Sequence, residues 1–127
     1  MRIVLFIALL AISLWAAPCW RIALFQFTFI DSALAAEITY GAKIFKANCS
    51  SCHIGGGNIL ISEKTLKKEA LSKYLEDYDA DSIQAIIYQV QNGKNAMPAF
   101  KSKLSEQDII DVAAYIVEKA EQNWQDS

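Results

Sequence analysis

The pentapeptide Cys49-Ser50-Ser51-Cys52-His53 restricts the fold of this 127-residue chain more than any other stretch. Two cysteines separated by two residues and followed by histidine form the C-x-x-C-H pattern of covalent c-type haem attachment. Each thiol adds to one vinyl group, and the two intervening residues let both sulfurs reach the same macrocycle. His53 then lies under the iron as its proximal ligand, through a neutral ring nitrogen. The pattern therefore predicts one haem c per chain, held by Cys49 and Cys52.

Two other interpretations of the same cysteines are weaker. A structural zinc site needs four ligands, whereas beyond residue 35 the chain offers only Cys49, Cys52 and His53 among the usual soft ligands. A thioredoxin-type dithiol places its cysteine pair at the start of a helix that follows a strand. No strand pattern precedes Cys49, so haem remains the preferred ligand. The third cysteine, Cys19, lies in the apolar leader and is expected to leave with it.

The first 35 residues differ in composition from the rest of the chain. They contain 27 hydrophobic residues, whereas the following 92 residues contain 41, an ordinary share for a globular domain. Arg2 precedes an apolar run, and the small residues Ala33 and Ala35 match the A-x-A cleavage pattern of a signal peptide. We therefore expect a signal peptide over residues 1–35, cleaved after Ala35, and one mature domain over residues 36–127.

The leader has one alternative interpretation, an uncleaved membrane anchor. The stretch Ile3–Trp20 approaches the ~20 apolar residues that cross a bilayer. Pro18, the charge of Arg21 and the cleavage pattern argue against an anchor. A mature protein that is not inserted in the membrane is the preferred prediction.

The mature domain is mildly acidic. Residues 36–127 carry ten lysines, no arginine and 13 acidic residues, so their net charge is −3, and the whole chain has a net charge of −2. Nucleic-acid-binding domains normally show a basic patch, so the charge excludes a nucleic-acid partner. The length of the domain also excludes a large multidomain enzyme.

Apolar residues recur at helical spacing in four segments of the mature domain, and no useful stretch alternates as a strand does. Asp81 or Ser82 can cap the third segment, and Gly93 ends it. Ser105 can cap the fourth with Asp108 as capping-box partner. We predict an all-α domain of about four short helices. The first covers residues 38–49, the second is marked by apolar residues from Leu66 to Tyr78, and the third ends before Gly93. The fourth follows Ser105, with an apolar face from Ile109 to Ala120 and Trp124 near its end.

Met97 is the only methionine of the mature domain, and His53 is the only histidine of the chain. A lone methionine is more often a gap-filler in a core. Pro98, however, favours extended backbone at Met97 and so a fixed loop, and 44 residues separate Met97 from His53. This length lets the chain reach the other face of a haem, so we predict that Met97 is the second axial iron ligand. Two filled positions favour electron transfer over catalysis, and thioether ligation raises the reduction potential.

The mature domain resembles the class I c-type cytochromes, and within them the cytochrome c6 family of cyanobacteria and algal plastids. The Tyr-Gln-Val stretch at 88–90 and the Gly-Lys-x-Ala-Met-Pro stretch at 93–98 are its most specific points. The resemblance implies a small class I cytochrome c fold wrapped around one covalently bound haem. The matching stretches are 41–45, 47–53, 55–56 with Asn58, 63–66, 87–90, 92–100, 104–105 and Trp124.

The resemblance also implies a function and a compartment. Members of this family carry single electrons from the cytochrome b6-f complex to photosystem I in photosynthetic electron transport, in place of plastocyanin. The chain is accordingly expected to be a monomeric electron-transfer protein of the thylakoid lumen, and not an enzyme.

Two further residues receive roles from the resemblance. Gln89 matches a glutamine beside the haem that tunes the potential, although a surface glutamine on a helix is the simpler interpretation. Lys103 stands where many members have arginine; it keeps the charge but lacks the planar fork that makes bidentate contacts. We expect Lys103 at the surface where a partner docks.

Two alternative functions follow from the same residues. A haem enzyme or gas sensor would need an open iron position, which Met97 is predicted to fill. A respiratory electron donor to a terminal oxidase, possibly held to the membrane by an uncleaved leader, would use the same haem site.

Overall fold

The part of the protein described by the structure, a computed structural model, comprises residue 35 and residues 37–125. The expected signal peptide, including Cys19, lies outside the described residues apart from Ala35, so its cleavage stays a prediction. Among the described residues, no helix is both long enough and apolar enough to cross a bilayer.

Helices and loops make up the whole of the described part, which contains no strand beyond the isolated bridge between Lys94 and Met97. The prediction of an all-α domain is therefore confirmed. An N-terminal helix, residues 37–48, leads into the later elements. These are α3 (Ser50–His53), the 3-10 turn η1 (Ile54–Gly56), α4 (Lys68–Tyr74), α5 (Ser82–Asn92) and α6 (Glu106–Glu121).

The predicted caps hold the ends of α5 and α6. The Asp81 carboxylate accepts from the Gln84 amide at 3.1 Å, and Gly93 ends α5 with a φ of 67°. Ser105 and Asp108 form the capping box of α6. The hydrogen bonds from the Ser105 hydroxyl and amide lower the pKa of Asp108, because they favour its ionised form.

The predicted helix over residues 66–78 is wrong in its bounds, since α4 covers only Lys68–Tyr74. At its start, the Leu66 amide donates to the Gly56 carbonyl at 2.7 Å and so belongs to a loop. At its end, Leu75 has extended backbone, and Asp77 has a φ of 61°. Apolar spacing alone did not distinguish these loop contacts from another helical turn.

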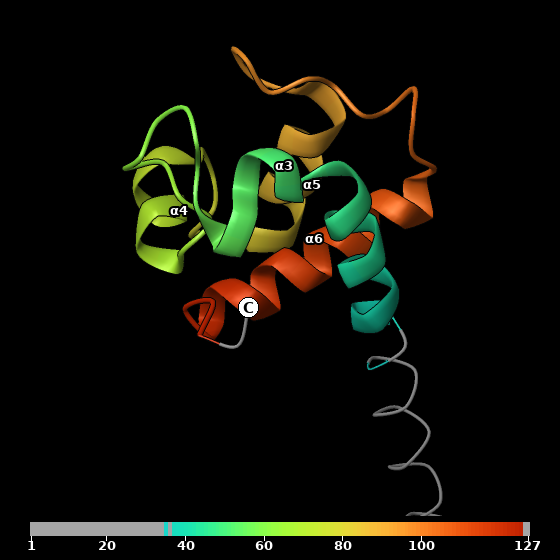
Figure 1. Ribbon diagram of the computed structural model, residues 1–127, viewed down its shortest axis with the longest axis horizontal. Helices are drawn as coiled ribbons and strands as arrows, with labels where there is room; N and C mark the ends of the chain where they lie inside the picture. Colours follow the sequence, from blue (N-terminus) through green and yellow to red (C-terminus); the bar gives the residue numbers. More distant parts are fainter. Residues whose placement is uncertain (1–34, 36, 126–127) are drawn as a thin grey trace, which may run out of the picture. The chain divides into compact units, whose positions relative to one another are not determined.

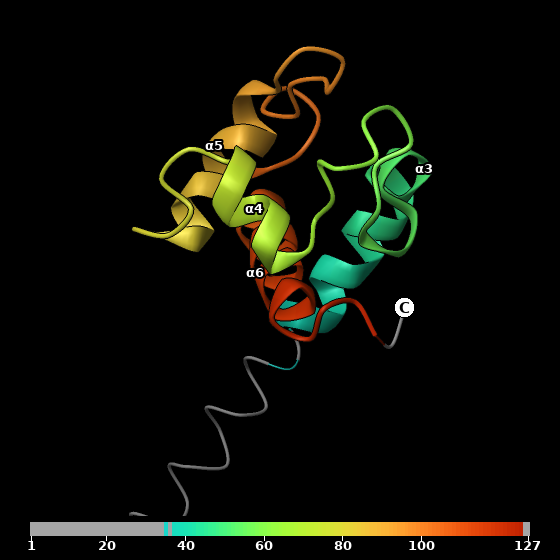
Figure 2. The same cartoon turned by 90° about the vertical axis from the view of Figure 1, so that its left-hand side faces the viewer.

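α6 is the helix against which α4 and α5 pack. Its larger contact is with α5 and its smaller one with α4. Figure 2 shows α5 and α3 on opposite sides, with the loop after α5 at the top and α6 below them, and Figure 1 shows the same elements from a view turned by 90°. The most buried side chains, Ile109 and Val112, both lie on α6.

The N-terminal helix crosses α6 at Gly41. A Cβ atom at Gly41 would lie within 3.0 Å of the Asp111 carbonyl and of the Tyr115 Cβ. The absence of a side chain therefore lets the two backbones touch. Nearby, the Tyr40 hydroxyl hydrogen-bonds to the Asp108 carboxylate, whose charge raises the pKa of Tyr40.

Gly41→Ala should destabilise the protein by about 1–3 kcal/mol, because the added methyl forces two backbones apart. Lys43→Ala adds the same residue on the exposed side of the same helix and should change the unfolding free energy by less than about 0.5 kcal/mol. Urea denaturation of the haem-bearing variants measures both changes. Equal stability of the two variants would show that the crossing is not limited by sterics.

Candidate functional site

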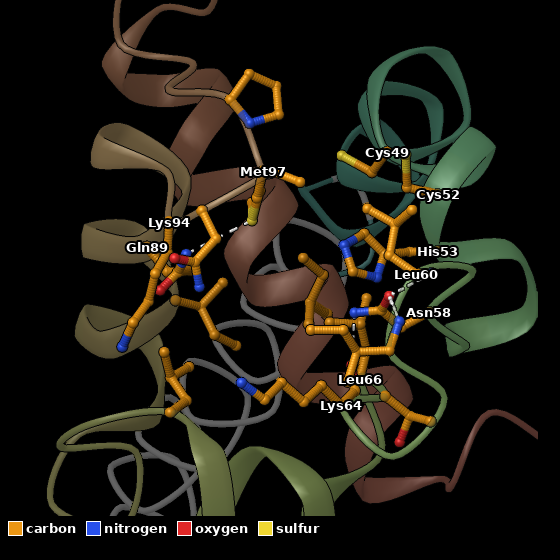
Figure 3. Close-up of a pocket in the computed structure, with 18 of the residues that line it drawn as sticks. Cys49, Cys52, His53, Asn58, Leu60, Lys64, Leu66, Gln89, Lys94 and Met97 are labelled. Carbon is orange, nitrogen blue, oxygen red and sulfur yellow. Dashed lines mark hydrogen bonds between the residues drawn. The ribbon is translucent and has the colours of Figure 1, made fainter.

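A cavity of about 490 Å³ opens between α3, α5 and the loop after α5. This volume falls in the range of roughly 300–1,000 Å³ that is usual for cofactor sites. Figure 3 shows Met97 and Gln89 on one wall and Cys49, Cys52 and His53 on the other. The structure therefore brings the two predicted axial ligands and both predicted attachment cysteines to one cavity.

The attachment cysteines sit on a single tight turn. The Cys52 and His53 amides both donate to the Cys49 carbonyl, at 3.1 and 2.9 Å, so the two thiols lie on the same face of the turn. Both are free, with Cys49 partly buried and Cys52 exposed. Burial, and secondarily the Cys52 charge, raise the pKa of the Cys49 thiol to about 11. Its sulfur is therefore protonated at neutral pH, unlike an activated dithiol.

The His53 imidazole is oriented by a backbone carbonyl. Its Nδ1 lies 2.9 Å from the Gly57 oxygen. Because a carbonyl oxygen only accepts, Nδ1 carries the proton in this bond and Nε2 keeps the lone pair that a metal requires. This is the arrangement that fixes the tautomer of metal-ligating histidines.

The loop that carries Met97 is held from both ends. Lys94 and Met97 exchange two backbone hydrogen bonds, at 3.0 and 3.1 Å. Asn95 has a φ of 56° in the turn between them. Gly93 contacts the Met97 carbonyl, Pro98 and Ala99 so closely that no Cβ would fit. The position of Met97 is thus determined by backbone packing as well as by Pro98.

Gln89 lies on α5 and lines the same cavity as Met97. Its Nε2 donates to the Met97 sulfur at 3.6 Å. A thioether sulfur is a weak acceptor with more than one lone pair. The amide therefore engages one side of the sulfur and leaves another toward the cavity. A direct contact between Gln89 and haem stays a prediction.

Lys103 lines the rim of the cavity and is exposed. Its ammonium group lies 6.0 Å from the centre of the Phe100 ring, a weak cation–π geometry. The side chain is therefore placed at the surface, and its docking role stays a prediction.

Sequence reasoning gave no role to three residues that shape the cavity. Lys64 and Lys94 line it, and their ammonium groups complement the two carboxylates that haem carries. Asn58 accepts from the Leu60 and Ile61 amides, each at 3.0 Å, and donates to the Lys64 carbonyl at 3.0 Å. An asparagine after three glycines is a sequence signal for such a turn. No sequence signal distinguishes Lys64 and Lys94 from lysines that face only solvent.

The geometry argues against the zinc interpretation. Among the described residues, no group of three or more His, Cys, Asp or Glu side chains is placed to hold a metal ion. A pair of free thiols on one turn, an imidazole with a free Nε2 and a thioether on the opposite wall instead fit haem c. The residues present therefore match the donor set that the C-x-x-C-H pattern implies.

Comparison with known proteins gives a consistent result. A family model described as cbb3-type cytochrome c oxidase subunit III matches residues 36–116. The chain is 56% identical over 92 residues to cytochrome c6 of a Synechococcus species, an alignment that covers 72% of this chain and 79% of that protein. It is also 56% identical over 103 residues to cytochrome c6 of a Nostoc species, over 81% and 89% of the two chains.

A solved structure shares the fold. The structure of cytochrome c6 from the diatom Phaeodactylum tricornutum is similar with a TM-score of 0.65 and 49% sequence identity. The alignment covers 68% of this chain and 98% of that one. The predicted class I cytochrome c architecture is therefore confirmed.

Gly93→Ala should displace Met97, because three backbone atoms occupy the space of the new methyl group. Gly55→Ala is the matched control, since Gly55 has a similar positive φ of 57° but nothing within 4 Å of an added Cβ. Gly55→Ala should lose about 1 kcal/mol, because its φ of 57° and ψ of 28° are left-handed helical values. Gly93→Ala should lose about 1–3 kcal/mol more, because its φ of 67° and ψ of 176° are nearly restricted to glycine and because the methyl group has no space. The sulfur-to-iron charge-transfer band of the ferric protein should weaken only in Gly93→Ala. A full-strength band in that variant would contradict this account of the loop.

Proposed function

The chain belongs to the cytochrome c6 family and carries a covalently bound haem c, and from that premise we propose that it takes single electrons from the cytochrome b6-f complex and delivers them to photosystem I. Its general character is that of a c-type electron carrier. The observation that carries the proposal is the placement of His53 and Met97 on facing walls of one cavity. With both donors on the iron, no position remains for a substrate or gas.

Each residue of the site has a defined part in this proposal. Cys49 and Cys52 hold the haem through thioethers, while His53 and Met97 are the axial ligands. The haem supplies reversible one-electron chemistry when bound. The protein keeps both ligands in place in either oxidation state, because the Gly57 carbonyl fixes the imidazole and the loop backbone fixes the thioether.

The charged and amide side chains around the cavity tune the reduction potential of the haem. Gln89 polarises the Met97 sulfur through its hydrogen bond. Lys64 and Lys94 line the cavity, where their charge would offset the negative charge of the haem carboxylates. A positive charge near the site favours the ferrous form, because it disfavours the more oxidised iron. These residues and the soft sulfur ligand favour a high reduction potential.

The partner surface is proposed to surround the cavity mouth. Lys103 lies on this rim, and Leu60 and Ile61, which also line the cavity, are 64% and 37% exposed. Weak electron-transfer complexes use small interfaces that form and separate quickly. An apolar centre with a lysine at its edge suits such an encounter.

Export to the thylakoid lumen is proposed from the leader. Cleavage after Ala35 would release the domain, whereas an uncleaved leader would favour the respiratory alternative with a terminal oxidase as acceptor. Mass spectrometry of the native protein separates these two outcomes, because the cleaved chain with haem is much lighter.

Electron delivery is tested with isolated photosystem I and a laser flash. The reduced protein should speed re-reduction of the photo-oxidised donor in proportion to protein concentration, and purified cytochrome b6-f complex with a quinol should reduce the ferric protein. Lys103→Gln removes one rim charge without touching a ligand, so it should slow the bimolecular rate and weaken its salt dependence. Efficient oxidation by a terminal oxidase with no reaction at photosystem I would overturn the proposal.

Replacing Met97 separates a carrier from a catalyst. Met97→Ala should lower the reduction potential and let carbon monoxide bind the ferrous protein quickly, because a position on the iron opens. Met97→His should also lower the potential but keep both positions filled, so it should bind carbon monoxide slowly. Redox titration and stopped-flow absorbance measure these changes. An unchanged potential in both variants would exclude Met97 as the ligand.

A further inference from the structure

The C-terminal end of α6 holds a bulky residue in an unfavourable backbone conformation. Asn123 and Trp124 have φ values of 56° and 57°, and the Trp124 amide donates to the Lys119 carbonyl at 2.9 Å. Asparagine adopts left-handed backbone readily, but for tryptophan it is a genuine outlier. Such a conformation persists only where the surroundings determine it. The contacts of the indole therefore hold Trp124 in this conformation.

The indole is clamped onto the turn that follows the haem-attachment motif. Trp124 is only 6% exposed, and any Cβ at Gly56 would collide with its ring. Its Nε1 donates to the Leu66 carbonyl at 2.8 Å. The Leu66 amide in turn donates to the Gly56 carbonyl at 2.7 Å. One ring thus restrains Gly56 twice, by direct packing and through Leu66.

Gly56 is one residue from the group that orients the imidazole. The Gly57 carbonyl accepts from His53 Nδ1 at 2.9 Å, and the Gly57 amide donates to the Ile54 carbonyl at 2.9 Å. Gly55 and Gly56 both have positive φ values. A run of three glycines has little rigidity of its own, so the position of this carbonyl depends on contacts from outside the turn.

We propose that Trp124 is a positioning residue for the proximal ligand, holding the Gly57 carbonyl against His53 Nδ1 from 71 residues further along the chain. The effect passes through Gly56 and Leu66. Trp124 does not line the cavity, so it acts on the imidazole and not by contact with haem. A carbonyl bonded to Nδ1–H makes the imidazole a more basic ligand, which stabilises ferric iron.

This inference rests on the proposed function, because it requires His53 to be an iron ligand. The first measurement tests that premise alone. Nuclear magnetic resonance of the native ferrous protein should show the His53 ring protons displaced by the ring current of the haem. Undisplaced resonances would overturn the ligand assignment before any Trp124 variant is compared.

The second measurement tests Trp124 itself, through the exchange rate of the His53 Nδ1–H proton with solvent. Trp124→Ala removes both restraints and should speed exchange by at least about tenfold, and the reduction potential should rise because the ligand becomes less basic. Trp124→Phe keeps a ring over Gly56 but cannot donate to the Leu66 carbonyl. Its exchange rate should therefore fall between those of the native protein and Trp124→Ala.

Val112→Ala is the matched control. Val112 is fully buried on the same helix, α6, so its truncation lowers stability without touching the glycine turn. It should leave both the Nδ1–H exchange rate and the potential close to those of the native protein. The proposal is overturned if Trp124→Ala leaves them unchanged as well, or if Val112→Ala changes them equally.

Discussion

The hydrogen bond between His53 Nδ1 and the Gly57 carbonyl is the contact on which the rest of the site depends. It selects the tautomer and aims Nε2 away from the backbone. The cysteines on the same turn then determine where the haem lies relative to that nitrogen. A change at Cys49 or Cys52 would alter attachment, and a displaced Gly57 carbonyl would alter the orientation of His53.

The cavity wall that carries Met97 is held mainly by the backbone contacts of a loop. Met97 lies on a loop without regular structure, and its sulfur is placed by paired backbone bonds, by Pro98 and by the tight contact at Gly93. α5 contributes through Gln89, which reaches the same sulfur. Helices thus support the two segments that carry the proposed ligands. α6 packs against α5, and Trp124, just after α6, packs against Gly56.

Charge is distributed unevenly over a mildly acidic domain. Three lysines, Lys64, Lys94 and Lys103, line the cavity. Acidic residues instead cap α6 and follow α4. This arrangement concentrates positive potential at the cavity, although the net charge alone predicts the opposite sign.

The sequence by itself determined the cofactor, the attachment cysteines, the all-α class and the caps of α5 and α6, because each depends on neighbouring residues or on a short repeat. It also pointed to His53 and Met97 as ligands, since residues 36–127 contain no other histidine or methionine. The bounds of α4 could not be predicted, because Leu66 bonds to Gly56 across a loop. Only the tertiary structure decided that Trp124 meets Gly56 and that Lys64 and Lys94 face one cavity. Such contacts join residues far apart in the chain, and local spacing carries no information about them.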